Sequence, residues 1–306
     1  MTATLLLGSL IALSGPAAAR DLLVGPTRAM KLPSQAAAAA KPGDVIIIDP
    51  GEYRDCAVWR ASDITIRAAA PQVVLAEKTC EAKGIFVVTG NNVTVDGITF
   101  REAAVPDRNG AGIRVSGENL TVLNSRFERN ENGILAVGSD KSILRISNSA
   151  FIGNGSCVAG CAHGVYAGAP IGLLEIDNCR FLATRDGHHI KSRALRTVIR
   201  NSRIEDGLGG TSSYLVETAQ GGDLLIEKTM LQKGPNSGNR RVAISIATEG
   251  TRNPTNTMVI KENYFRTDVP GGTTFVRNAA QVPVQLIDNR ISGDAQPLQG
   301  AGSIIP

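Results

Sequence analysis

Apolar residues recur in this chain with the two-residue period of a β-strand, inside a motif that is itself repeated. Its successive copies read VTVDGITF, LTVLNSRF, LRISNSAF, LEIDNCRF, TVIRNSRI, LIEKTML, MVIKENYF and VQLIDNRI. The copies end at apolar residues that lie 23 to 34 positions apart: Phe100, Phe127, Phe151, Phe181, Ile204, Leu231, Phe265 and Ile291. A strand motif with this spacing is typical of a solenoid, in which each coil buries its apolar face by stacking on the next.

Aligned copies of the motif share two more columns of mostly apolar residues, which precede these end points. One lies five residues earlier, at Val95, Val122, Ile146, Ile176, Ile199, Ile226, Ile260 and Leu286, and the other lies seven residues earlier, where only Thr197 is not apolar. We expect like residues to stack in parallel register, about 4.8 Å apart from coil to coil. Asn124, Asn148, Asn178 and Asn201 form a polar column whose amides can bond along the solenoid axis.

A second strand family precedes the first in each coil, with the segments GIFVV, GIRV, GILAV, GVYA, HIKS, YLVE and VAISI. Each coil therefore has at least two strands, and we expect a short third side. These patterns predict an all-β fold, a right-handed parallel β-helix of about eight to ten coils that forms one domain over residues 20–306.

The segment from Leu32 to Tyr53, LPSQAAAAAKPGDVIIIDPGEY, resembles the N-terminal cap of the pectate-lyase-like β-helix superfamily. In that superfamily a short capping helix closes the end of the solenoid, and here Ser34 is expected to cap an alanine-rich helix that KPGD ends. The resemblance implies the fold. It leaves the activity open, because this fold hosts lyases, hydrolases, epimerases and proteins without catalytic activity.

The first 19 residues combine an apolar run, Leu5 to Leu13, with small residues before Arg20, which indicates a signal peptide over residues 1–19. We therefore expect a periplasmic or secreted protein without a membrane span. In an exported protein, disulfides are expected between Cys56 and Cys80 and between Cys157 and Cys161. Cys179 falls in the column of Ser125, Ser149 and Ser202, which predicts a small buried residue rather than a redox group.

The charge composition limits which classes of binding partner are expected. The net charge is only +4 and is spread along the chain, so no basic block indicates nucleic-acid binding. Cofactors are not expected. The aspartate-rich calcium site of pectate lyases is not evident in the sequence, although calcium is left open.

The segment DGHHIKSR, Asp186 to Arg193, holds two of the three histidines of the chain. If Ile190 faces the core like Val165 one coil earlier, then His189, Lys191 and Arg193 share the outer face. Neighbouring coils add further polar residues to this strip. The expected face comprises His163, Tyr166, His189, Lys191, Arg193, Tyr214, Glu217 and Arg241, and the last of these coils also offers Asn239.

Such a strip suits an anionic polysaccharide, because Arg and Lys pair with uronate carboxylates. Lyase or epimerase chemistry needs a base for the proton beside the carboxylate, a cation for the developing charge and a proton donor. We predict Lys191 as the base, with a pKa lowered by neighbouring cations. His189 is the alternative base or acid, and Tyr214 or Glu217 completes proton transfer. Substrate binding is assigned to Arg193, His163, Tyr166, Arg241 and Asn239.

The segments HIKS and RTVIRNSRI resemble a strand of the alginate- and chondroitin-lyase β-helix family, and the resemblance implies that Lys191 is the base. One coil later the chain departs from that family. YLVETAQGG stands where the family has a catalytic arginine, and Glu217 lies near the place of that arginine. Arg193 or Arg241 would have to supply the charge from another position.

Two other classes of function remain open from the sequence. An inverting glycoside hydrolase of the same fold could use Asp186, Asp206 and Glu217 as its carboxyl groups. A non-catalytic β-helix that binds glycans or supports the cell envelope would show neither reaction.

Overall fold

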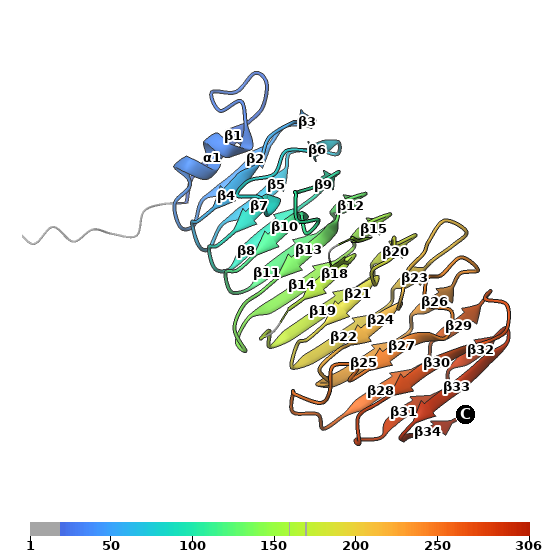
Figure 1. Ribbon diagram of the computed structural model, residues 1–306. Coiled ribbons are helices and arrows are strands. Elements are labelled where there is room, and N and C mark those ends of the chain that lie inside the picture. Colours follow the sequence, from blue (N-terminus) through green and yellow to red (C-terminus); the bar gives the residue numbers. More distant parts are fainter. Residues whose placement is uncertain (1–18, 159, 169) are drawn as a thin grey trace, which may run out of the picture.

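The computed structural model describes residues 19–158, 160–168 and 170–306. The chain winds through three long parallel sheets, here called A, B and C, in about 11 turns, slightly more than the sequence predicts. Each full turn runs from C to A to B, so like strands of successive turns lie side by side (Figure 1). The parallel β-helix expected from the repeat is therefore confirmed. The expected signal peptide lies almost wholly outside the described residues.

The bounds of the strands follow the order of the sheets. Sheet A contains β1 Asp21–Val24, β2 Val45–Ile48, β5 Thr65–Ala68, β8 Val93–Asp96, β11 Leu120–Leu123, β14 Ile143–Ser147, β19 Leu173–Asp177, β22 Arg196–Arg200, β25 Asp223–Glu227, β28 Met258–Lys261, β31 Val284–Ile287 and β34 Gly302–Ile305. Sheet B contains β3 Gly51–Tyr53, β6 Val73–Ala76, β9 Ile98–Arg101, β12 Arg126–Glu128, β15 Ala150–Ile152, β20 Arg180–Leu182, β23 Arg203–Glu205, β26 Met230–Lys233, β29 Tyr264–Thr267 and β32 Arg290–Ser292. Sheet C contains β4 Ala57–Trp59, β7 Gly84–Val88, β10 Ala111–Val115, β13 Asn132–Ala136, β18 Val165–Ala167, β21 Ile190–Ser192, β24 Val216–Thr218, β27 Val242–Ile246, β30 Thr273–Asn278 and β33 Ala295–Gly300.

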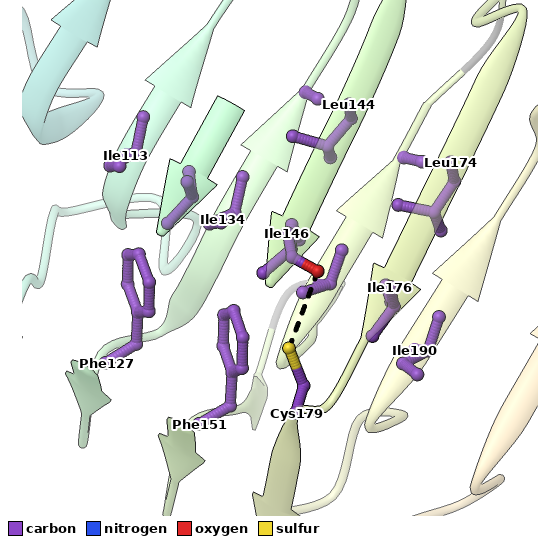
Figure 2. Packing of buried hydrophobic residues seen from close by; sticks show 14 of the residues in the cluster. Ile113, Phe127, Ile134, Leu144, Ile146, Phe151, Leu174, Ile176, Cys179 and Ile190 are labelled. Carbon is purple, nitrogen blue, oxygen red and sulfur yellow. Dashed lines mark hydrogen bonds between the residues drawn. The ribbon is translucent and has the colours of Figure 1, made fainter. Parts of the chain in front are cut away.

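The apolar columns read from the sequence stack in register along the axis. Phe100, Phe127, Phe151 and Phe181 pair across neighbouring strands of sheet B, with ring centroids 4.6 to 5.2 Å apart. Ile146 and Ile176 pair in sheet A in the same way, and Figure 2 shows these side chains converging on the interior. Stacking of this kind buries the apolar face that a single coil leaves open.

Asparagine occupies the turn between sheets A and B for a backbone reason as well as a side-chain one. Asn124, Asn148, Asn178 and Asn201 all have φ between 48° and 52°, the left-handed region that asparagine tolerates better than most residues. Three of their amides also donate along the axis in a surface ladder: Asn178 donates to Asn148 at 2.8 Å, and Asn124 and Asn201 donate to Asp96 and Asp177 at 2.7 Å. Both features favour asparagine at this position of the coil.

The cysteines pair as the sequence suggests. Cys56 is joined to Cys80, and Cys157 is joined to Cys161 in a small hairpin, β16 Ser156–Cys157 and β17 Cys161–Ala162. Cys179 is a buried free thiol whose Sγ lies 3.6 Å from the carbonyl oxygen of Ile146 (Figure 2). Burial raises the pKa of Cys179 to about 12, so this thiol is unreactive.

Helix α1, Pro33–Ala39, lies at the N-terminal end of the solenoid against β4 and β1 (Figure 1). The prediction that Ser34 caps this helix is wrong. The N-cap is Leu32, two residues earlier, and the helix begins at Pro33; the Gln35 side chain accepts the backbone N–H groups of Lys31 and Leu32. Proline at the first helical position is favoured because its missing N–H would have no partner there. Within the described residues, no helix is long and apolar enough to cross a membrane.

Candidate functional site

The outer face of sheet C carries one column of polar side chains across five coils. Tyr166 on β18, Lys191 on β21 and Glu217 on β24 are register partners, and Ser245 and Arg277 continue the column on β27 and β30. The alternate residues of these strands face the core, as Ile190 does beside Val165. The sequence register of Ile190, Lys191 and Glu217 is therefore confirmed.

Lys191 lies between two carboxylates. Its Nζ is 3.2 Å from Glu217 and 3.0 Å from Glu249, and its side chain is only 14% exposed. Burial by itself would lower the pKa of Lys191, but the two carboxylates outweigh burial and raise this pKa. The predicted lowering by neighbouring cations is wrong, because acidic groups surround the ammonium. Lys191 is a cation and a proton donor in this arrangement.

Arg193 and Tyr166 form the second part of the site. The Arg193 guanidinium binds both carboxylate oxygens of Glu249, with Nε 2.8 Å from Oε2 and Nη2 2.6 Å from Oε1. Its Nη1 also donates to the hydroxyl of Tyr166. The Tyr166 ring centroid lies 5.9 Å from Lys191 Nζ and 5.3 Å from Arg193 Cζ, so this phenol is held beside two cations.

Glu217 is held by contacts with three side chains. Its carboxylate lies 3.1 Å from His188 Nε2, accepts a hydrogen bond from Thr248 and pairs with Lys191. Burial raises the pKa of Glu217, but the contacts with His188, Thr248 and Lys191 outweigh burial and lower this pKa to about 2. Glu217 is therefore an anion that anchors its neighbours.

His163 and His188 form a ladder on the same face. Nδ1 of His163 accepts the backbone N–H of His188 at 3.0 Å, and Nδ1 of His188 accepts that of Tyr214 at 3.2 Å. Since each Nδ1 is an acceptor, the proton of each neutral ring sits on Nε2. Burial lowers the pKa of both histidines. These rings therefore present N–H donors rather than basic nitrogens. The position of His188 on this face was not predicted from the sequence.

His189 does not lie on the outer face, so the position predicted for it from the sequence is wrong. Its side chain is completely buried, with Nδ1 2.8 Å from Thr184 Oγ1 and Nε2 2.9 Å from Asp206 Oδ1. The reason is local. His189 directly precedes β21, at the corner where the chain enters sheet C, so the alternation of the strand does not extend to it.

Asp206 connects His189 to a buried lysine. Lys233 Nζ lies 3.5 Å from Asp206 and donates to the carbonyl oxygens of Ser212 and Ser213, directly before Tyr214. All of the side chain of Lys233 is buried, and burial lowers its pKa to about 8. This network supports the strand that carries Glu217 from beneath, and it offers no group to a substrate.

The remaining predicted residues lie further along the face. Tyr214 stacks against His188 at 4.9 Å between ring centroids, and its hydroxyl accepts a hydrogen bond from Arg277 at 3.1 Å. Arg241 and Arg277 line a cavity of about 470 Å³. Asn239 uses its side chain to accept the backbone N–H of Arg241, so it shapes the loop beside the cavity.

Sequence reasoning missed Glu249, Thr248, Ser245 and Arg277. The last two follow from the column of Lys191 once VAISI and TFVRN are placed in register, so a signal for them exists. Glu249 and Thr248 lie in the turn after β27, where no periodic pattern fixes side-chain positions. No cluster of three or more histidine, cysteine or acidic side chains arranged to hold a metal ion occurs in residues 19–158, 160–168 and 170–306.

No protein-family model matches the sequence, and no curated protein matches it. The solved structures do contain similar chains. An alginate lyase from Paenibacillus sp. str. FPU-7 has a TM-score of 0.69 at 15% identity and covers 92% of this chain and 99% of its own. The pectate lyase Pel9A has a TM-score of 0.51 at 16% identity, with 92% and 79% covered. At these identities the likeness shows that this chain has the right-handed parallel β-helix fold.

Proposed function

We propose that this protein is a lyase that cleaves an acidic polysaccharide by β-elimination on the outer face of sheet C. The observation that carries the proposal is the placement of the Tyr166 phenol beside both Lys191 and Arg193. Elimination from a uronate needs this set of groups: cations for the carboxylate, a base for the adjacent C–H and a donor for the leaving oxygen. Two structures of the same fold are lyases by name, which supports the reaction class.

The roles follow from the contacts. Lys191 and Arg193 bind the uronate carboxylate and stabilise the charge that develops when the adjacent C–H bond breaks. The oxygen of Tyr166, which accepts a hydrogen bond from Arg193, acts as the base in its phenolate form and takes that proton. The electron pair forms the carbon–carbon double bond while the bond to the glycosidic oxygen breaks. The Lys191 ammonium supplies a proton to that oxygen, which gives Lys191 the role of acid in place of the base expected from the sequence.

The hydrolase alternative has less support. A glycosidase of the usual kind needs a carboxylic acid that stays protonated near neutral pH. The pKa values of Glu217 and Glu249 are instead lowered to about 2, and Asp206 is completely buried. Asp186 is exposed and accepts a hydrogen bond from Thr211, away from the column of Lys191.

Three readouts on a panel of acidic polysaccharides separate the candidate functions. A lyase produces the ultraviolet absorbance of an unsaturated uronate together with new reducing ends. A hydrolase produces the reducing ends alone, and an epimerase changes the sugar composition without shortening the chain. Binding without any of these changes would indicate a non-catalytic β-helix, and it would contradict the proposal.

We expect Lys191→Ala to lower the cleavage rate by about a hundredfold, because it removes a cation at the developing charge. Stability should also fall, by about 1–3 kcal/mol, since the buried carboxylate of Glu217 loses its ion pair. Lys261→Ala is the matched control, because Lys261 contacts Glu227 at 3.1 Å on sheet A. Steady-state kinetics and denaturant unfolding measure both effects, and an unchanged rate in folded Lys191→Ala would remove Lys191 from the mechanism.

Chelation gives a further prediction. In this mechanism the positive charges of Lys191 and Arg193 neutralise the uronate carboxylate without a metal ion, so EDTA should leave the cleavage rate unchanged. A loss of activity that added calcium restores would show that the mechanism lacks an essential component.

We also propose that the protein acts outside the cytoplasm, and its two disulfides support an oxidising compartment.

A further inference from the structure

We propose that Glu249 occupies the binding site of the substrate carboxylate in the free protein, and that an acidic sugar must displace it to bind. The proposal rests on the proposed function, because it assumes an acidic glycan as the substrate. Glu249 would then act as a specificity-determining residue: it holds the site closed to neutral sugars and yields to a carboxylate.

The geometry is that of a bound carboxylate ligand. Oε1 of Glu249 lies 2.6 Å from Arg193 Nη2 and 3.0 Å from Lys191 Nζ, while Oε2 lies 2.8 Å from Arg193 Nε. A planar carboxylate on the fork of a guanidinium is the preferred geometry of this pair. The carboxylate of a uronate has the same shape and charge, so it can take the same three contacts beside Tyr166.

Glu249 is easier to displace than Glu217. Its side chain is 29% exposed, whereas that of Glu217 is 5% exposed and has Thr248 and His188 as further donors. Glu249 also lies outside the sheet strands, in a turn between Ala247, with φ 57°, and Gly250, with φ 89°. A carboxylate that is partly exposed regains water more readily than a buried one, so releasing Glu249 costs less than releasing Glu217 would.

Charge balance explains why a carboxylate is needed. Lys191 and Arg193 carry two positive charges, and Glu217 and Glu249 balance them. If an anionic sugar replaces Glu249, both cations keep a partner. A neutral sugar would leave the partly buried Arg193 without its anion and Lys191 with Glu217 alone, which is unfavourable. The same exchange predicts that removing the charge of Glu249 strengthens the binding of acidic sugars.

The test compares Glu249→Gln with wild type for binding of monomeric uronates, which have no glycosidic bond to cleave. Galacturonate, mannuronate and glucuronate are titrated separately by calorimetry, with galactose, mannose and glucose as neutral counterparts. Glu227→Gln is the matched control, because Glu227 also lies between an arginine and a lysine, at 2.7 Å from Arg200 and 3.1 Å from Lys261. Glu249→Ala repeats the test without an amide, and thermal unfolding checks that each variant is folded.

We expect Glu249→Gln to lower the Kd of at least one uronate by about fivefold or more, with a smaller gain for its neutral counterpart and no gain in Glu227→Gln. Unchanged or weaker uronate binding in both Glu249 variants would overturn the inference, as would an equal gain for neutral sugars. The proposed reaction is judged separately on the wild-type protein. Tighter uronate binding without any unsaturated product would support the carboxylate site and contradict the lyase.

Discussion

Tyr166→Phe should lose about a thousandfold in cleavage rate while the protein stays folded, which is within the usual range for loss of a general base. The substitution removes only the hydroxyl that accepts a hydrogen bond from Arg193. The ring, which packs edge-on against His163 at 5.1 Å between centroids, is retained. The free energy of unfolding should therefore change by no more than about 1–2 kcal/mol. Kinetics on the cleaved polysaccharide and denaturant unfolding measure the two quantities.

Two other tyrosines serve as comparisons. Tyr264→Phe, on sheet B, removes a hydroxyl that lies 2.9 Å from Ser292 and should leave the rate unchanged. Tyr214→Phe removes a hydroxyl that contacts Arg277 on the site face, and we expect a loss of about tenfold or less. If Tyr214→Phe is the inactive variant and Tyr166→Phe keeps its rate, proton transfer belongs to Tyr214, as the sequence suggested.

Asp206→Ala should destabilise the protein by about 3–5 kcal/mol, because it leaves a buried cation without a counter-ion. Asp206 accepts hydrogen bonds from Ser237 at 2.6 Å and from the backbone of Gly234 at 3.0 Å, in addition to its contacts with His189 and Lys233. None of the four groups would find water in the interior. The measurement is the free energy of unfolding in urea.

An exposed aspartate provides the control. Asp96 accepts one hydrogen bond, from Asn124 at 2.7 Å, in the surface ladder, so Asp96→Ala should cost about 1 kcal/mol or less. If Asp206→Ala were as stable as Asp96→Ala, the buried network would not be the support that its contacts indicate.

The fold could be predicted from the sequence because it is a repeat. The stacked partners of Ile146 and Phe151 are the residues that the motif aligns, since coil stacking imposes the same register on every copy. The positions of Lys191 and Glu217 on one face followed from the same rule. The periodic pattern thus predicts the facing and the stacked partners of side chains that belong to strands.

The corners between strands could not be predicted in this way. His188 and His189 lie just before β21, where the alternation of the strand does not hold, so His189 is buried and His188 contacts Glu217 instead. The predicted lowering of the pKa of Lys191 was wrong for a related reason. Glu249 reaches Lys191 from a turn that is distant in sequence, and this contact makes the surroundings acidic where the local segment HHIKSR reads as basic.

The central claim is elimination on the face of sheet C, and cleavage in water enriched in heavy oxygen tests it most directly. Elimination breaks the glycosidic bond without adding water. Products that are reduced to alditols at once, before the new reducing end exchanges its oxygen with water, should therefore contain no heavy oxygen in mass spectrometry and should carry an unsaturated uronate at the non-reducing end. Incorporation of heavy oxygen into a saturated product at the cleaved bond would show hydrolysis and contradict the account.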